Sequence, residues 1–583
     1  MFRSLTKLGA QAHTIAYLAD GFLDPYQIEI VQGLLEKAQS GGANLLCFVG
    51  GPLPRDPQHS DGRHGVYDLA TRAVCDGFVI SGTGLNHEVG TPGLLDFSKR
   101  LGDTPACTVG VRADGAVTVN PDNERGMERI ASHLIEVHAA KRIALVRGPR
   151  NNDEADDRER AFRLAHTRHR LPVEEQLIVE GDFTFESGGA AVAKLISALG
   201  SSITSLDAIV ASNDRMAIGV MLALRERGIS VPGDIAVTGF DDIAEAELTH
   251  PPLSTVRQAM PRLGREAMRS VLEQIQHGAK GASQVLDVEV VLRRSCGCSG
   301  LATSRSSPEA ARSGHWGGSL LPHRERIHLE LTRVSQGTLG AAGRGWEQRL
   351  FTGMVDALEQ DDAVFLKALQ AVAERLLHAS NELSRLDEVV QVLRQQLVPL
   401  FGEKDQAARD RLEALIHASR TMLFEMSVGA MHNERIGLLR SNRNVASICN
   451  GLSCAFDYGE LQNALRINLP LLGIQGAFVA LYDEKDSQRA RLICAFDRDS
   501  DLTHFQGQAF ARRALLPPAL ASGSGQQGRS YTVHALVWRG RMLGHLLLEL
   551  YQGSLPVTEA LATAIAAGLE RAVSRANSSS PRP

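Results

Sequence analysis

The first 290 residues alternate short apolar runs with longer amphipathic stretches. Continuous apolar character predicts buried strands at residues 13–20, 43–50, 75–84, 142–149, 206–214 and 234–242. Apolar residues spaced three and four apart predict helices between them, as in residues 25–42, 124–140 and 214–228. Because apolar strands separated by amphipathic helices are typical of parallel sheets covered on both faces, we predict an α/β fold for this half.

The second half of the chain has a different pattern. Residues 300–319 are rich in Ser, Gly and Ala and predict a linker. Helical spacing then dominates, and residues 407–452 are compatible with one long helix. Helix and strand patterns return near residue 457, with a hairpin turn at "WRG". The predicted domains are therefore 1–298, a linker 299–321, a helical segment 322–456, a mixed domain 457–576 and a disordered tail 577–583.

Polar residues follow two of the predicted strands where each strand ends. The segment "ASND" contains Asn213, and "GFDD" contains Asp241 and Asp242. Ligands bind at the carboxyl ends of parallel strands, so these side chains are expected to face one crevice. Carboxylates at such a place can hold a metal, perform acid–base chemistry or accept hydrogen bonds from hydroxyl groups. The pattern favours a binding cleft.

Composition excludes several classes of protein. The net charge of −5 gives no general attraction to nucleic acid or to anionic membranes. No apolar run is long enough to span a bilayer, and the first residues lack the apolar centre of a secretory signal. The eight cysteines are scattered, unlike a disulfide framework. We therefore expect a cytoplasmic protein with reduced thiols and no membrane partner.

Four segments of the first half together resemble the effector-binding domain of the lactose-repressor (LacI) family. They are "VNPDNERGMERIASHLIEVHAAKRIALVRGP", "DDRERAF", "DAIVASNDRMAIGVMLALRERGISVPGDIAVTGFDD" and "HPPLSTVRQAMPRLGREAM". The resemblance covers residues 13–293 and implies a periplasmic-binding-protein-like type I fold. It also implies a hinged sensor without catalysis, in which two lobes close over a small effector such as a sugar or a nucleobase.

Carried over position by position, the resemblance implies ligand contacts at Arg158, Asn213 and Asp241. An arginine fork, an amide and a carboxylate can together satisfy vicinal hydroxyl groups in a dry cleft. The acidic run "NNDEADD" before Arg158 disfavours an anionic ligand. Ala161 departs from the family pattern, because glycine is usual there.

Further candidates follow the first predicted strand. Phe22 and Tyr26 can supply a stacking face, with Asp24 between them, and Asp122 of "NPDN" can line the cleft. Helix capping or loop anchoring is the alternative for Asp122, and equally for Asp214 and Asp242.

Metal and enzyme functions find little support. The chain has no Walker phosphate loop, no His-Glu-x-x-His helix and no Gly-x-Ser-x-Gly elbow. Cys296 and Cys298 of "SCGC" lie one residue apart, which suits a metal or a redox pair. Two thiols do not complete a tetrahedral zinc site, and no nearby cysteine pair supplies the rest. We expect unreactive thiols, no metal, no cofactor and no enzymatic activity.

Residues 457–576 are similar in element order to a GAF domain, a small α+β ligand-binding or dimerising module. The expected architecture is thus a two-lobed α/β domain, a helical segment and a GAF-like domain. Only 12 residues precede His13. A helix-turn-helix of the family does not fit there, so we expect no direct specific DNA binding.

Two functions remain open. The first is a cytoplasmic sensor that binds a sugar-like or nucleoside-like effector in the two-lobed cleft and signals through the helices to the GAF-like module. Its expected partner is a downstream signalling or regulatory protein. The second is a LacI-type transcriptional regulator that acts on DNA through a partner or an unrecognised surface. The long helices need a packing partner, so a homodimer is expected in either case.

Overall fold

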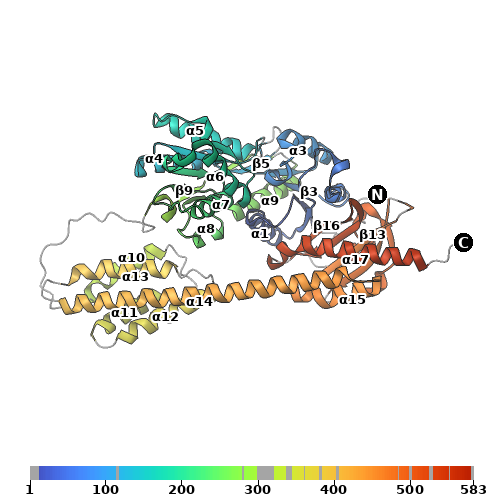
Figure 1. Cartoon of the computed structure of the whole chain (residues 1–583). Coiled ribbons are helices and arrows are strands. Elements are labelled where there is room, and N and C mark those ends of the chain that lie inside the picture. Colours follow the sequence, from blue (N-terminus) through green and yellow to red (C-terminus); the bar gives the residue numbers. More distant parts are fainter. Residues whose placement is uncertain are drawn as a thin grey trace. The chain divides into compact units, whose positions relative to one another are not determined.

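The structure is a computed structural model that describes most of the chain in two compact units (Figure 1). One unit combines residues 1–300 with 445–583, and the other consists of residues 301–444. The described residues are 12–112, 117–150, 152–278, 281–298, 321–335, 345–359, 362–379, 384–401, 406–483, 485–486, 488–497, 502–523, 529–550 and 552–579. The predicted linker falls almost wholly outside them.

The first lobe is a parallel sheet flanked by helices. Its strands lie in the order β11-β5-β4-β3-β1-β2. The strands are β1 (Thr14–Ala19), β2 (Asn44–Val49), β3 (Gly77–Ser81), β4 (Ala106–Val109), β5 (Val117–Pro121) and β11 (Gln284–Leu286). The helices are α1 (Pro25–Ser40), α2 (Gly82–Leu85), α3 (Gly90–Ser98) and α9 (Met260–His277). Helices α1 and α9 pack closely because Gly33 and Gly264 lie where a Cβ atom would collide with the opposite backbone.

The second lobe has a smaller parallel sheet in the order β7-β6-β8-β9. Its strands are β6 (Ile143–Arg147), β7 (Ile178–Glu180), β8 (Ala208–Ala211) and β9 (Ala236–Thr238). Its helices are α4 (Asn123–His138), α5 (Asp153–Arg168), α6 (Phe185–Leu199), α7 (Asp214–Arg225) and α8 (Ala244–Leu248). A small antiparallel pair, β10 (Thr255–Arg257) and β12 (Glu289–Val291), packs against α4. The predicted strands and helices of this half are confirmed.

The chain crosses between the lobes at three places. The crossings connect β5 to α4, β10 to α9, and β11 to β12. Strands β5 and β11 pair next to one another, and Asp122 N donates to Leu286 O at 2.9 Å. Residues just beyond these crossings therefore lie at the junction of the two lobes.

The C-terminal region forms a largely antiparallel sheet with its own helices. Its strands are β13 (Gly476–Tyr482), β14 (Arg489–Asp497), β15 (Ala509–Ala511), β16 (Ser530–Trp538) and β17 (Arg541–Glu549). Its helices are α15 (Tyr458–Asn468), α16 (Pro518–Gly523) and α17 (Thr558–Ser579). The hairpin predicted at "WRG" is confirmed, because β16 pairs antiparallel with β17 around Arg539 and Gly540. Helix α17 continues to Ser579, three residues into the predicted tail.

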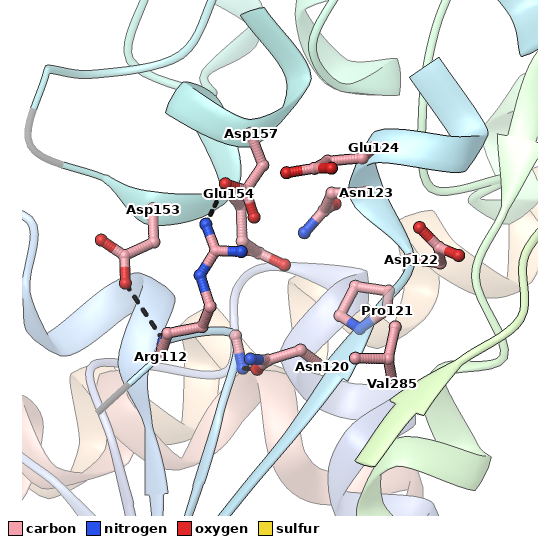
Figure 2. A pocket seen from close by; sticks show the side chains of 11 residues that line it. Arg112, Asn120, Pro121, Asp122, Asn123, Glu124, Asp153, Glu154, Asp157 and Val285 are labelled. Carbon is pink, nitrogen blue, oxygen red and sulfur yellow. Dashed lines mark hydrogen bonds and ion pairs between the residues drawn. The ribbon is translucent and has the colours of Figure 1, made fainter. Parts of the chain in front are cut away.

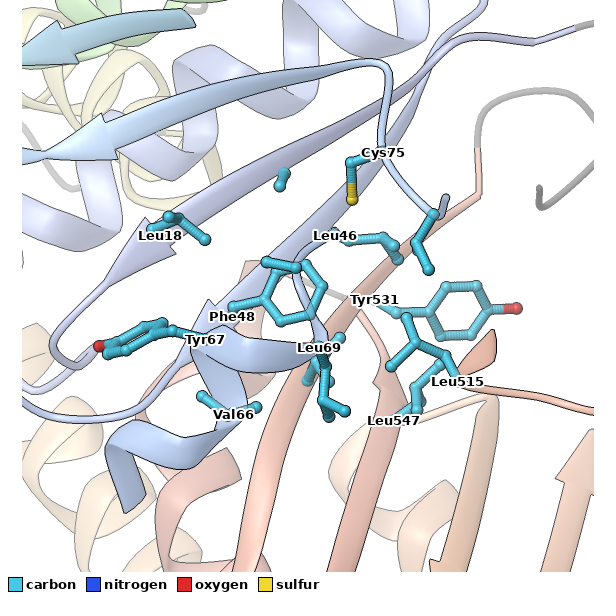
Figure 3. Packing of buried hydrophobic residues seen from close by; sticks show 14 of the residues in the cluster. Leu18, Leu46, Phe48, Val66, Tyr67, Leu69, Cys75, Leu515, Tyr531 and Leu547 are labelled. Atoms are coloured by element: carbon cyan, nitrogen blue, oxygen red, sulfur yellow. The ribbon is translucent and has the colours of Figure 1, made fainter. Parts of the chain in front are cut away.

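Strand β16 also pairs with the first lobe, which the sequence did not predict. It runs parallel to β2, with Tyr531 opposite Leu46 and Val533 opposite Phe48. The result is one sheet of 11 strands in the order β11-β5-β4-β3-β1-β2-β16-β17-β13-β14-β15. Figure 3 shows the shared apolar cluster, in which Phe48 and Leu46 pack near Tyr531 and Leu547. Strand β2 would otherwise present an open edge, and such edges favour unwanted pairing.

In residues 301–444, all regular elements among the described residues are helices. The helices are α10 (Arg324–Ser335), α11 (Trp346–Glu359), α12 (Asp362–Ala379), α13 (Ser384–Leu397) and α14 (Gln406–Ser453), the last continuing beyond this unit. They share one apolar core that includes Trp346, Phe351, Phe365, Leu393 and Leu412. The single long helix predicted for 407–452 is confirmed. Among the described residues, no helix is both long enough and apolar enough to cross a membrane.

Candidate functional site

Arg158 is the centre of a buried polar cluster at the junction of the two lobes. It lies on α5, whose first turn carries Glu154 and begins after the capping residue Asn152. Its side chain is almost completely buried. Nε donates to Asn123 Oδ1 at 2.8 Å, and Nη1 donates to Ser212 O at 2.7 Å. The guanidinium carbon lies 4.0 Å from the ring centroid of Phe240, which adds a cation–π contact.

The third nitrogen of Arg158 has no close acceptor among the described residues. Nη2 lies 3.6 Å from Glu154 Oε1 and 3.9 Å from Asp241 Oδ1. Both distances exceed a normal hydrogen bond, although each preserves electrostatic attraction. A ligand hydroxyl can therefore accept from Nη2 while donating to one of the carboxylates. Ligand contact by Arg158 and Asp241 stays a prediction, with which this arrangement is compatible.

Asp241 is held in a conformation that is rare for a residue with a side chain. Its φ of 117° lies in the left-handed half of backbone space, and the next residue, Asp242, has φ 61°. Gln258 Nε2 donates to Asp241 Oδ1 at 2.6 Å, and Asp241 N donates to Val256 O at 2.8 Å. Backbone strain of this kind concentrates at functional sites, where the surroundings hold it in place.

The two aspartates of "GFDD" have different partners. Asp242 forms ion pairs with Arg257 at 2.6 Å and with Arg293 at 2.7 Å. Asp242 therefore anchors the loop, which is the structural role considered for it from the sequence. Asp241 instead faces Arg158. The divergence excludes a metal held jointly by these two carboxylates in this geometry.

Several buried polar atoms of the cluster have no hydrogen-bond partner among the described residues. They include Tyr26 Oη, Glu154 Oε1 and Gln258 Oε1. Burial, followed by the nearby carboxylates of Glu154 and Asp241, raises the pKa of Tyr26 well above its usual range. Burial also raises the pKa of Glu154 and of Asp241, and Arg158 opposes this rise for both. Buried polar groups are normally paired, so these atoms are groups that a polar ligand could satisfy.

A small pocket adjoins this cluster and shares Asn123 and Glu154 with it (Figure 2). Its volume is about 170 Å³. Its lining includes five carboxylates, from Asp122, Glu124, Asp153, Glu154 and Asp157, and one cationic side chain, Arg112. Arg112 forms an ion pair with Asp157, and its backbone N donates to Asp153 Oδ2 at 3.1 Å. The excess of carboxylates disfavours an anionic ligand.

The two lobes are joined by hydrogen bonds beside the cluster. Thr83 Oγ1 of α2 donates to Glu154 Oε2 of α5 at 2.6 Å. Thr91 Oγ1 of α3 donates to Asp153 Oδ1 at 2.8 Å. Asn123 and Gln258 belong to two of the chain crossings. The cluster is therefore built from both lobes and from the segments that connect them.

The other residues predicted to contact a ligand each have a structural role, as a helix cap or as part of the apolar core. Asp24 caps α1 by accepting from Tyr26 N, and Asp122 caps α4 by accepting from Arg125 N while lining the pocket. Asn213 caps α7, and its Nδ2 donates to Phe183 O at 3.0 Å. Phe22 is completely buried in the apolar core of the first lobe. Ligand contact by these four residues stays a prediction.

Sequence reasoning did not select Glu154, Asn123 or Gln258. Glu154 lies one helical turn before Arg158, a spacing that puts both side chains on one face, but the acidic run was considered only for its charge. Gln258 follows β10 directly, and Asn123 follows Asp122. Their positions at the chain crossings were not visible without the fold.

Comparisons with known proteins match the first half of the chain. Residues 131–296 match the family model of the periplasmic binding protein-like domain. The HTH-type transcriptional repressor CytR of Escherichia coli is 28% identical over 287 residues, which are 49% of this chain and 80% of that protein. The HTH-type transcriptional regulator CelR of Thermobifida fusca is 31% identical over 188 residues, 32% of this chain and 54% of that protein.

Among solved structures, a transcriptional regulator CelR–cellobiose complex matches 49% of this chain and 86% of its own, with 25% identity and a TM-score of 0.43. The predicted resemblance of the first half is confirmed by the sequence relatives, whereas the GAF resemblance of residues 457–576 stays a prediction. Residues 131–296 therefore match a periplasmic binding protein-like domain, and the first half of the chain is similar in sequence to the transcriptional regulators CytR and CelR.

Proposed function

We propose that this chain is a cytoplasmic, non-enzymatic sensor that binds a sugar-like or nucleoside-like effector at the junction of its two lobes. The observation that supports this most is the convergence of Arg158 Nη2, the unpaired Tyr26 Oη and the unpaired Gln258 Oε1 beside Asp241. These groups offer donors and acceptors but no nucleophile–base pair. A neutral molecule with several hydroxyl groups satisfies them without adding charge to an acidic site.

Effector binding is expected to strengthen the contact between the lobes. Glu154 already accepts from Thr83 across the junction, and Asn123 and Gln258 lie on the crossings. A ligand that bridges Arg158 and Asp241 from the second lobe to Tyr26 of the first favours the closed arrangement by its differential affinity.

We further propose that the C-terminal region responds to effector binding through a direct contact with the first lobe, whereas the sequence predicted signalling to the GAF-like module through the helices. Phe22 N, in the turn after β1, donates to Glu559 Oε1 of α17 at 3.0 Å. Glu559 also lies 3.5 Å from Arg63. The turn that holds Phe22 leads directly to Asp24 and Tyr26. A movement of this turn on ligand binding therefore changes a contact of α17 without passing through the helical segment.

Transcriptional regulation through a protein partner is the second candidate. Its support is that the curated relatives include the HTH-type transcriptional repressors CytR and PurR, so the domain type is used for gene control in those proteins. In this case the effector controls a complex on DNA rather than a separate signalling protein. A homodimer, as predicted from the helices, is compatible with both candidates.

A thermal-shift screen of the full-length protein tests the proposal. The panel pairs neutral sugars and nucleosides with their phosphorylated forms. A matching neutral compound present at about 100 times its Kd stabilises the folded state by about 2.7 kcal/mol, which raises the unfolding temperature. The phosphorylated form is expected to have no effect because of the carboxylates around Arg112. Stabilisation by phosphorylated compounds alone would contradict the proposal.

To separate the two candidates, the protein loaded with the identified effector is used to capture partners. A DNA-binding partner whose operator complex responds to the effector supports regulation of transcription. A partner without affinity for DNA supports the sensor.

A further inference from the structure

Two histidines and two cysteines of the second lobe converge far from the cluster around Arg158. His133 and His138 lie on the last turns of α4, and Cys296 ends the short helix η6 (Arg294–Cys296), with Cys298 two residues later. One potential ligand atom from each of the four residues lies within 4.8 Å of all the others. Two thiols alone do not complete a tetrahedral metal site, but the fold brings two histidine nitrogens to them.

The distances agree with a tetrahedral arrangement around one ion. Zinc bonds of about 2.3 Å to sulfur and about 2.0–2.1 Å to nitrogen place two nitrogens about 3.3 Å apart and a nitrogen and a sulfur about 3.6 Å apart. The two Nε2 atoms are 3.2 Å apart. Cys298 Sγ lies 3.4 Å from each of them, and Cys296 Sγ lies 3.8 Å from His133 Nε2.

The backbone between the two cysteines allows both of them to lie close to the histidines. Gly297, between them, has φ 101°, a conformation that residues with side chains rarely adopt. A Cβ atom at Gly297 would lie 3.2 Å from ring atoms of His138, so the residue also needs to be small. Glycine at this position therefore favours the approach of the cysteines to the histidines.

Outer contacts hold the first sulfur in place. Ser254 Oγ donates to Cys296 Sγ at 3.1 Å. The neighbouring Ser295 Oγ donates to Val237 O at 2.6 Å, and Ser254 N donates to Ser295 Oγ at 2.8 Å. Hydrogen bonds from a second layer of residues orient metal ligands and tune their basicity. Cys296 is buried, and the other three side chains are partly buried.

We propose that His133, His138, Cys296 and Cys298 form a structural zinc site. Two thiolates and two neutral imidazoles are a soft donor set that suits zinc and does not suit magnesium or calcium. Binding releases the two thiol protons, and four protein ligands leave no position open for catalysis. The ion ties the C-terminal end of α4 to the end of the second lobe.

A zinc ion at this place would affect the effector site through α4, because the helix connects the two sites. The opposite end of α4 carries Asn123, whose Oδ1 accepts from Arg158. Fixing the far end of the helix limits its movement, and thereby the position of Asn123. The zinc site is nevertheless independent of the proposed effector chemistry, because its ligands do not touch the cluster around Arg158.

Metal content of the full-length protein, purified without chelators or affinity metals, tests the proposal. We expect about one zinc ion per chain by elemental mass spectrometry. Cys298→Ser and His138→Asn should each reduce zinc to a small fraction of the wild-type content. Cys454→Ser and His277→Asn are matched controls, because both residues are exposed and lie outside the cluster, and they should retain zinc. Equal loss in the controls, or another metal in place of zinc, would overturn the proposal.

Two measurements on the wild-type chain remain decisive if a variant does not fold. Replacement of zinc by cobalt should produce sulfur-to-cobalt charge-transfer bands and the intense visible bands of a tetrahedral centre. Two thiols should be protected from a thiol reagent until a strong chelator is added. A cobalt spectrum without sulfur bands would refute the site. A disulfide between Cys296 and Cys298, seen as a mass lower by two hydrogens, would also refute it and identify a redox pair.

Discussion

The first lobe has two junctions with the rest of its unit, one polar and one apolar. Towards the second lobe it presents Tyr26 and Thr83, which meet Glu154, Arg158 and Asp241. Towards the C-terminal sheet it presents β2, whose Phe48 and Leu46 pack with residues of β16 and β17. The polar junction contains unpaired buried atoms, whereas the apolar junction forms one continuous core.

The apolar junction stabilises the fold, whereas the polar junction can respond to a ligand. Apolar burial contributes about 25 cal/mol per Å² whether or not a ligand is present. An unpaired buried polar group costs about 1–3 kcal/mol until something pairs with it. A ligand can therefore shift the polar junction, while the apolar junction keeps the C-terminal sheet attached to the lobe that moves.

The largest effect is expected from a substitution that creates a cavity in the apolar junction. Phe48 is fully buried, so Phe48→Ala should lower the free energy of unfolding by about 3–5 kcal/mol. Hydrogen exchange in residues 529–550 should rise, because β16 loses its packing against β2. Phe424→Ala is the matched control, since Phe424 is 69% exposed, and it should have little effect. A loss below about 1 kcal/mol in Phe48→Ala would mean that the junction is not a core.

The next effect is expected from the titration of a buried carboxyl group of the first lobe. Burial raises the pKa of Asp20, at the end of β1, from 3.8 to about 7. Between these values the folded state holds a proton that the unfolded state lacks, so stability is highest below the lower value and falls as pH rises. The slope is about 1.4 kcal/mol per pH unit for one such carboxyl. Asp20→Asn should reduce this slope in denaturation curves between pH 5 and 7; an unchanged slope would exclude Asp20 as its source.

Removing an unpaired hydroxyl should have a smaller and opposite effect. Tyr26→Phe eliminates a buried oxygen without a partner, so the stability without ligand should stay the same or rise by up to about 1 kcal/mol. In the control Tyr17→Phe, the lost hydroxyl donates to Gln27 Oε1 at 2.5 Å, and stability should fall by about 1–3 kcal/mol. Denaturation midpoints compare the two. Equal losses would show that Tyr26 Oη is paired in solution.

An effect of similar size is expected at the contact between α17 and the turn after β1. Glu559→Ala removes the acceptor of Phe22 N, which should cost about 1 kcal/mol and speed hydrogen exchange at the Phe22 amide. Glu570→Ala on the same helix is the control. If exchange at Phe22 is unchanged in Glu559→Ala, this contact does not connect the two regions.

The sequence predicted each lobe better than it predicted the junctions. Apolar runs identified β1, β2 and β3 because a buried parallel strand has a local signal. Arg158 and Asp241 were found from motifs that are also local. The pairing of β2 with β16 has no such signal, because the partners lie at opposite ends of the chain. For the same reason, the cysteines near residue 297 did not reveal the histidines of α4.

The candidate site was predicted in part for a related reason. Residue types at strand ends identified Asp241, but its partner Gln258 depends on how β10 continues into α9. Glu154 was hidden within an acidic run. Capping explains Asp24, Asp122 and Asn213 equally well as ligand contact does, and only binding measurements distinguish the two roles.

Isothermal titration of the full-length protein with the neutral compound selected by the thermal-shift screen tests the central claim most directly. Arg158→Met removes the fork that faces Glu154 and Asp241 and should weaken binding by about 1–3 kcal/mol, roughly 5- to 150-fold. Arg168→Ala, on the exposed last turn of the same helix, should bind as the wild type does. Wild-type affinity in Arg158→Met would contradict the account, because it would place the effector outside the buried polar cluster.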